Sequence, residues 1–176
     1  MPAVAKTLAK KKPVIVLQRT RNPLPESQRS EVVRALQPLQ AGSLELYLQM
    51  KNAHWNVRGN GFSGLHTLFD DIAKDTAEIA DSMAERVAIL GGEPLATIQK
   101  LAVVPQLADA PTGMKSQDEF VKLCADRIAY YVQMLRDAND TFDKNNDPVS
   151  QDICIKAAGV LEKRLWLTES HILNRI

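Results

Sequence analysis

Apolar residues recur at intervals of three and four along most of this chain, which is the pattern of amphipathic α-helices. The clearest run extends over residues 62–90, and Gly91 with Pro94 behind it provides a stop signal. An earlier run over about residues 27–57 predicts another long helix with Pro38 inside it. The proline predicts either one bent helix or a short helix followed by a long one.

Two further long helices are predicted in the C-terminal half. Ser116 and Glu119 form a capping-box pattern at the start of one, and Asp147 followed by a proline starts the other. The connection over residues 94–115 contains three prolines and shows a short helical pattern near residues 95–101. It is longer than the connection that two neighbouring antiparallel helices require. No stretch predicts a strand. The predicted fold is therefore all-α, a ferritin-like four-helix bundle with a long crossover between helices 2 and 3 that carries a short extra helix.

The first 25 residues differ in composition from the rest. The 176 residues are 45% hydrophobic and 24% charged, as expected of one globular domain. Residues 1–25 hold six basic residues and no acidic one, whereas the remaining 16 basic and 21 acidic residues leave residues 26–176 with a net charge of −5. Prolines and the lack of a helical period predict a basic, flexible or extended N-terminal arm at 1–25 and the bundle domain at 26–176.

Compartment signals are few. No apolar run reaches the roughly 20 residues that a membrane span needs, and residues 14–17 are too short for the apolar core of a secretory signal. Cys124 and Cys154 are interpreted as buried free thiols, with a disulfide as the alternative. These signals therefore predict a cytoplasmic protein without membrane contact.

Two pairs of candidate metal ligands lie on the second predicted helix. His66 and Asp70 are four residues apart, as are Asp81 and Glu85, so each pair shares a helix face. At 100° and about 1.5 Å per residue, the two pairs point within about 20° of each other but lie roughly 16 Å apart. Metal–ligand bonds are only about 2 Å long, so one ion cannot join the pairs within one chain.

Two copies of this helix, packed antiparallel about a two-fold axis near residues 75–76, would bring the pairs together. His54, just before the turn that precedes the helix, completes one half of the site. Ala73, Ala77 and Ala84 are predicted to share the face and to allow close approach. Imidazole and carboxylate ligands suit iron, and they also suit zinc and manganese.

The alternatives to a shared metal site are a solvated acidic face with structural histidines, or a di-iron site inside one chain. The second requires Glu-x-x-His on two helices. Lys51, Ser63 and Thr168 stand three residues before the histidines, so that pattern is absent.

Four blocks of sequence resemble the Dps family of mini-ferritins. They are K-N-A-H-W-N-V-R-G at 51–59, F-x-x-L-H-x-x-F-D at 62–70, D-x-M-A-E-R-x-x-x-L-G-G-x-P at 81–94 and L-W-L-T-E-S-H-I at 165–172. The resemblance implies a hollow homo-dodecamer built from two-fold dimers, with ferroxidase sites between subunits. It also implies that Fe(II) is oxidised, preferentially with hydrogen peroxide, and that ferric mineral is stored inside. A protein of this kind protects DNA in stress, in the bacterial cytoplasm or nucleoid. The implied iron ligands are His54, His66 and Asp70 of one subunit and Asp81 and Glu85 of its mate.

Three further roles are open at this level. Trp55 is either a core aromatic or a trap for oxidising equivalents beside the site. The arm either binds DNA non-specifically or only aids solubility. The alternative to a ferroxidase is a non-enzymatic protein that compacts the nucleoid and has a vestigial or structural metal site. The acidic residues around the end of the third long helix either line an iron-entry pore or are solvated, with Asp147 as a cap. The DNA candidates are Lys6, Lys10, Lys11 and Lys12, and the pore candidates are Asp137, Asp140, Asp143 and Asp147.

Overall fold

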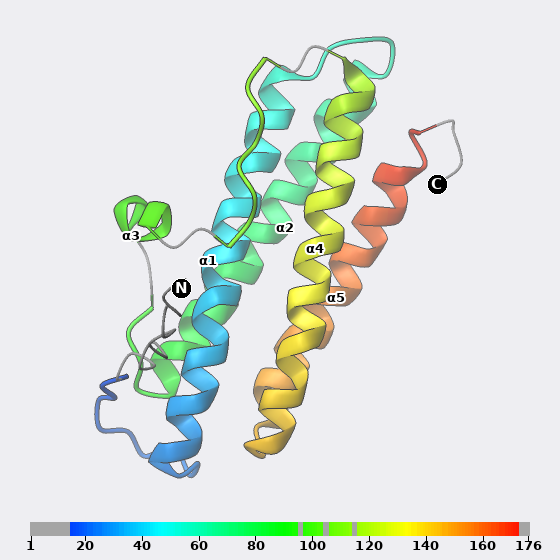
Figure 1. The fold of residues 1–176 in the computed structure, drawn as a ribbon. Coiled ribbons are helices and arrows are strands. Elements are labelled where there is room, and N and C mark those ends of the chain that lie inside the picture. The colour runs from blue at the N-terminus through cyan, green and yellow to red at the C-terminus, as the bar shows by residue number, and fades with distance from the viewer. Residues whose placement is uncertain (1–14, 95–96, 104–105, 114–115, 173–176) are drawn as a thin grey trace, which may run out of the picture.

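The computed structural model is helical wherever it has regular secondary structure, and it describes residues 15–94, 97–103, 106–113 and 116–172 (Figure 1). The four long helices are α1 (Glu26–Asn56), α2 (Phe62–Ile89), α4 (Gln117–Lys144) and α5 (Pro148–Glu169). A short helix, α3 (Ile98–Val103), lies between α2 and α4. The predicted fold class, including the crossover with its extra helix, is confirmed.

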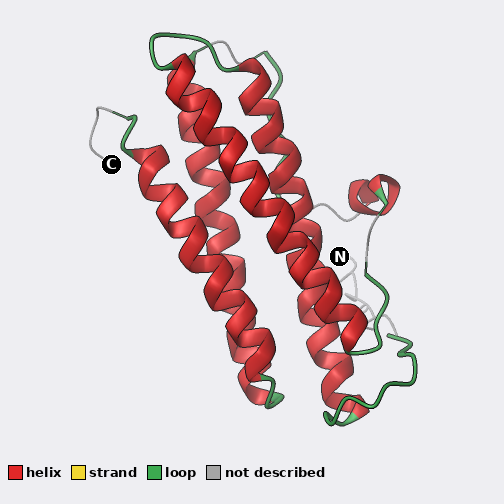
Figure 2. Ribbon diagram, turned by 180° about the vertical axis from the view of Figure 1, so that it is seen from behind, coloured by secondary structure: helices red, strands yellow, loops and turns green. Residues whose placement is uncertain are grey.

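The long helices form a bundle in which α1 packs along α2 and α4 packs along α5. Further contacts join α1 to α4 and α2 to α5, and both views of the ribbon show this arrangement (Figures 1 and 2). The crossover returns along the length of the bundle, so α4 runs parallel to α2. Only a long connection permits this topology.

One stripe of α2 supplies much of the core. The residues predicted to face inward are all buried, from Leu65 at the start of the helix to Val87 near its end. α1 continues through Pro38 as a single helix, which decides between the two predicted forms. The candidate ligands of α2 lie outside this stripe, where His66 and Asp70 are half-buried and Asp81 and Glu85 are exposed.

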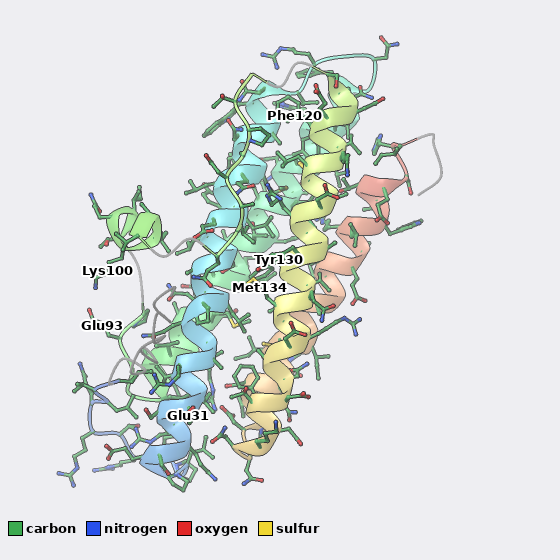
Figure 3. The ribbon with its side chains drawn as sticks, viewed as in Figure 1. Glu31, Glu93, Lys100, Phe120, Tyr130 and Met134 are labelled. Carbon is green, nitrogen blue, oxygen red and sulfur yellow. The ribbon has the colours of Figure 1, made fainter. Side chains whose placement is uncertain are left out.

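The crossover is attached to α1 by polar side chains. The Glu45 carboxylate accepts hydrogen bonds from the backbone N–H of Gln106 at 3.0 Å and of Leu107 at 2.7 Å, and Gln49 donates to the Ala108 carbonyl at 2.9 Å. α3 lies apart from the four long helices (Figure 1). Its Lys100 forms a 3.7 Å ion pair with Glu93, which follows α2 (Figure 3). α3 begins a few residues later than predicted.

The part of the N-terminal arm that the structure describes, residues 15–25, is extended and lies against the bundle. The Gln18 N–H donates to the Gly91 carbonyl at 2.7 Å, and Ile15, Leu17 and Leu24 pack on the core. A Cβ at Gly91 would lie 2.5 Å from the Gln18 carbonyl oxygen, and the φ of Gly91 is +87°, so glycine is required there. Residues 15–25 thus show the extended form that the sequence allows, and apolar side chains and a backbone hydrogen bond attach them to the bundle. The candidate DNA-binding lysines Lys6, Lys10, Lys11 and Lys12 lie outside the described residues.

Two predicted helix starts and the state of the cysteines are confirmed. Ser116 and Glu119 form a capping box, and the Asp147 carboxylate accepts from the Ser150 N–H with a proline at the first helical position. Cys124 and Cys154 are buried free thiols, and burial raises the pKa of the Cys154 thiol to about 12. No helix in the described part of the chain is long and apolar enough to cross a bilayer.

Candidate metal centre

Two histidines from different helices meet at the end of the bundle where α1 turns into α2. The His54 and His66 rings stack with centroids 3.7 Å apart and an interplanar angle of 22°. The His54 Nδ1 lies 2.7 Å from the His66 carbonyl oxygen, and the His66 Nδ1 lies 2.8 Å from the His54 carbonyl oxygen. Because a carbonyl oxygen only accepts, each Nδ1 carries the proton. In the tautomer with the proton on Nδ1, Nε2 keeps a lone pair for a metal ion, and a backbone carbonyl commonly fixes this tautomer in metal sites.

Asp70 follows His66 by one helical turn and is held by two lysines. Its Oδ1 lies 2.7 Å from the Lys51 Nζ on α1, and its Oδ2 lies 2.8 Å from the Lys74 Nζ on α2. The hydrogen bonds from Lys51 and then Lys74 hold the pKa of the Asp70 carboxyl well below its usual value of 3.8, and Asp70 in turn raises the pKa of Lys74. Asp70 is therefore a candidate anionic ligand. With the two histidines it forms one candidate half-site, although these three side chains do not gather closely enough in one chain to hold a metal ion.

The other half-site lies further along α2. Asp81 and Glu85 are both exposed, and Asp81 is eleven residues beyond Asp70, roughly 16 Å at about 1.5 Å per residue. Across the residues that the structure describes, no three His, Cys, Asp or Glu side chains gather closely enough to hold a metal ion. The two groups of candidate ligands are thus separate within one chain.

The exposed strip between the two half-sites is narrower than the sequence predicts. Ala77 is exposed and Ala84 half-buried, but Ala73 is only 1% exposed and belongs to the core. The prediction that Ala73 lies on the exposed face is wrong, because position 73 is rotated about 60° around the helix axis from Asp70, toward the buried side of α2. Two small residues, Ala77 and Ala84, therefore remain on the face that another helix could approach.

Two acidic neighbours of the half-site are engaged elsewhere. Asp75 lies 2.6 Å from the Arg164 Nε on α5, and Asp71 lies 3.5 Å from the same guanidinium. Their carboxylates therefore bind α2 to α5 and leave Asp70 as the carboxylate beside the histidines.

Trp55 lies on the surface of the chain next to His54, with 61% of the residue exposed. The Lys51 Nζ is 5.6 Å from the centre of its ring. Trp55 is therefore not a core aromatic within one chain. Its role as a trap for oxidising equivalents stays a prediction.

The acidic residues at the end of α4 divide into two groups. Asp137, Asp140 and Asp143 are exposed. Asp147 is 1% exposed and lies 2.5 Å from the Arg86 Nη2. Burial alone would raise the pKa of the Asp147 carboxyl, but hydrogen bonds from Arg86 and Ser150 outweigh it and lower the pKa. Asp147 is thus a structural cap and ion-pair partner, which leaves three exposed carboxylates as pore candidates.

Sequence reasoning missed the two lysines on Asp70. Lys74 follows Asp70 by four residues, a spacing that predicts an ion pair on a helix and could have identified it. Lys51 lies on another helix, and no local spacing connects it with Asp70. The reciprocal hydrogen bonds of the two histidines likewise exist only once α1 and α2 pack together.

Comparison with known proteins defines first the class of the chain. The family model described as a ferritin-like domain matches residues 33–176. The DNA protection during starvation protein of Agrobacterium fabrum is 32% identical over 157 residues, which cover 89% of this chain and 97% of that protein. The DNA protection during starvation protein 1 of Deinococcus radiodurans is 30% identical over 154 residues, 84% of this chain and 71% of its own length.

Solved structures agree with these relatives. Mycobacterium smegmatis Dps in its tetragonal form is 27% identical, has a TM-score of 0.84 and covers 89% of this chain and 96% of its own. Dps from Microbacterium arborescens in the high iron form is also 27% identical, with a TM-score of 0.79 over 88% of this chain and 99% of its own. The chain belongs to the Dps family of ferritin-like proteins.

Proposed function

We propose that the protein is a ferroxidase and iron-storage mini-ferritin whose oxidation sites form between subunits. The observation that carries this proposal is the division of the ligands into two half-sites on one face of α2, with no complete set in the described part of one chain. An antiparallel partner would set His66 and Asp70 opposite the partner's Asp81 and Glu85. The solved relative in the high iron form supports iron as the substrate.

The residues suit the oxidation of ferrous iron. Two imidazole Nε2 atoms and the Asp70 carboxylate offer one half of the ligand set, and the partner's Asp81 and Glu85 add two carboxylates. Hard anionic oxygen ligands favour the higher charge of Fe(III), so they make electron loss from Fe(II) more favourable. Two Fe(II) ions each give up one electron, and one hydrogen peroxide accepts both as its O–O bond breaks to two hydroxides. With few ligands per iron, positions stay open for peroxide.

The assembly that this chemistry requires is at least a dimer. A homo-dodecamer of such dimers is the form that the family implies, with the ferric mineral inside it. Asp137, Asp140 and Asp143 are exposed at the end of α4 and are the remaining candidates for an iron-entry pore. Zinc or manganese would fit the same imidazole and carboxylate ligands.

Stopped-flow oxidation tests the proposal. Anaerobic Fe(II) followed by hydrogen peroxide should give a rapid rise of ferric absorbance with the unaltered protein. The double variant His66→Ala and Asp70→Ala should lose that fast phase, because half of the ligand set is gone. Asp126→Ala is the matched control, since this carboxylate pairs with Lys122 on α4, away from the candidate ligands. Equal rates for the double variant and the unaltered protein would refute the site.

DNA binding by the arm is a second proposed activity, which the net charge of residues 1–25 and the names of the relatives favour. Deleting residues 1–12 removes Lys6, Lys10, Lys11 and Lys12 and should abolish the retardation of DNA in a gel. The affinity of the intact protein should fall with salt at a log–log slope of about −0.9 per phosphate contact. Equal retardation without the arm would exclude these lysines. DNA compaction without any iron oxidation would favour the alternative of a purely structural nucleoid protein.

A further inference from the structure

Both oxygens of the Asp70 carboxylate are occupied by ammonium groups. Lys51 reaches Oδ1 at 2.7 Å from α1, and Lys74 reaches Oδ2 at 2.8 Å from one turn further along α2. The two lysines differ in accessibility, because the Lys51 side chain is 20% exposed and the Lys74 side chain is 66% exposed. Each carboxylate oxygen keeps a second lone pair, so an ion that binds Asp70 shares the carboxylate with these ammonium groups and is repelled by their charge. Lys74 is the one that can move into solvent.

Lys74 also lies where the two half-sites would meet. It precedes Asp81 by seven residues, so the two residues point within about 20° of each other on α2. With a two-fold axis near residues 75–76, Lys74 comes opposite Ala77 of the partner subunit, and its ammonium group reaches toward Asp81 of the partner subunit. A flexible four-carbon stem opposite an alanine has room to turn away.

We propose that Lys74 is a counter-ion of the oxidation site. Lys74 stays paired with Asp70 until a divalent cation displaces the lysine, and this competition sets the iron concentration at which the site fills. This inference rests on the proposed inter-subunit site. Asp70 and the partner subunit's Asp81 and Glu85 bring three negative charges together, and Lys51 and Lys74 supply two positive charges. The lysines therefore reduce the repulsion between the acidic halves while no iron is bound.

An ammonium group suits this role. It is a compact single charge on a mobile chain and has no lone pair while protonated, so it contributes attraction to the carboxylates without becoming a metal ligand. Lys74 lies 2.8 Å from Asp70 and 3.8 Å from Asp71, so its ammonium group faces two carboxylates on α2. A divalent cation that brings twice the charge and also binds the imidazoles displaces it. The exchange moves a side chain and leaves the helices in place.

Isothermal titration of the metal-free assembly with Zn²⁺ tests this inference without any oxidation chemistry. Lys74→Met removes the charge and keeps much of the length, and it should bind Zn²⁺ about tenfold more tightly, as expected for one positive charge removed about 5 Å from a dication in water. Lys74→Arg keeps the charge and should stay near the unaltered affinity. Lys122→Met is the control, because Lys122 pairs with Asp126 at 3.1 Å on exposed α4, away from the ligands.

The outcomes separate this inference from the proposed function. If the Lys74→Met protein and the unaltered protein bind Zn²⁺ equally while both oxidise iron, the counter-ion role is refuted and the oxidation site stands. If neither binds Zn²⁺ nor oxidises iron, both ideas fail. Tighter binding in Lys74→Arg as well as in Lys74→Met would also overturn the inference, since it would show that shape and not charge is responsible. Circular dichroism checks that each variant is folded.

Discussion

A mixture of two inactive variants is expected to regain iron oxidation. Asp70→Ala damages one half-site and Asp81→Ala damages the other, so each variant alone has no intact site. When the two proteins are dissociated and reassembled together, a mixed dimer combines an intact His66 and Asp70 with an intact Asp81 and Glu85 from the other chain. With random pairing, about a quarter of the sites in the mixture become complete. Stopped-flow ferric absorbance before and after reassembly measures the recovery.

A mixture of Asp70→Ala with His66→Ala provides the matched control for this experiment. Both substitutions lie in the same half-site, so every dimer that forms has two damaged sites and no rate should return. Sedimentation confirms that the mixed proteins reassemble in both cases. Recovery in neither mixture, with assembly intact, would contradict a site that is divided between chains.

Replacement of Arg86 is expected to destabilise the protein more than replacement of any exposed arginine. Its guanidinium lies 2.5 Å from Asp147 and 3.0 Å from the Ser150 hydroxyl, and it ties α2 to the turn between α4 and α5. Arg86→Met would leave the buried Asp147 carboxylate without its counter-charge. Loss of one partner of a buried ion pair costs about 3–5 kcal/mol of unfolding free energy. Denaturant unfolding at a fixed protomer concentration measures the loss, because assembly contributes to stability.

Arg136→Met is the control for this prediction. Arg136 pairs with Glu162 across α4 and α5, but the two side chains are 60% and 44% exposed, so the expected loss is at most about 1 kcal/mol. Adding Asp147→Asn to Arg86→Met should restore part of the stability, because asparagine still caps α5 and carries no charge. An Arg86→Met protein as stable as the Arg136→Met protein would contradict the prediction.

The stability difference between Arg86→Met and the unaltered protein should depend on pH. The folded pKa of Asp147 is lowered from the ordinary value of 3.8, so its ionised form contributes stability above that value. This contribution is lost as the pH falls through the lowered pKa of the folded protein. In Arg86→Met, burial without the counter-charge would raise the pKa of Asp147. The difference between the two proteins should therefore be full at neutral pH, begin to shrink above pH 4 and continue to shrink down to the lowered pKa of the unaltered protein. Unfolding curves between pH 3 and pH 7 test the sign.

The helices and the ligand pairs were predictable because both depend on spacing along the chain. The helical period places His66, Asp70, Asp81 and Glu85 on one face of α2 whatever the rest of the fold does. The same reasoning misplaced Ala73, which lies near the boundary between the exposed face and the core. The position of that boundary depends on how the neighbouring helices pack against α2, and a single helix cannot reveal it.

The contacts that tune the site could not be predicted from spacing. Lys51 and Asp70 are 19 residues apart, and Arg86 and Asp147 are 61 residues apart, so each pair meets only through the packing of different helices. The proline-rich sequence of the arm likewise gave no sign that residues 15–25 lie against the bundle. That attachment depends on a left-handed glycine at the end of α2 and on three apolar side chains.

The attachment of the arm at Gly91 limits how far its lysines can extend from the protein. The Gln18 N–H is hydrogen-bonded to the Gly91 carbonyl, and Ile15 packs on the core. The chain is therefore anchored at Ile15, well before the first residue of α1. Lys6 lies nine positions before that anchor, so its Cα is at most about 30 Å from the anchor at full chain extension. Any DNA phosphate that Lys6 contacts must lie within this radius plus the length of the lysine side chain. The docking of a short extended segment thus defines a capture distance for a polyanion.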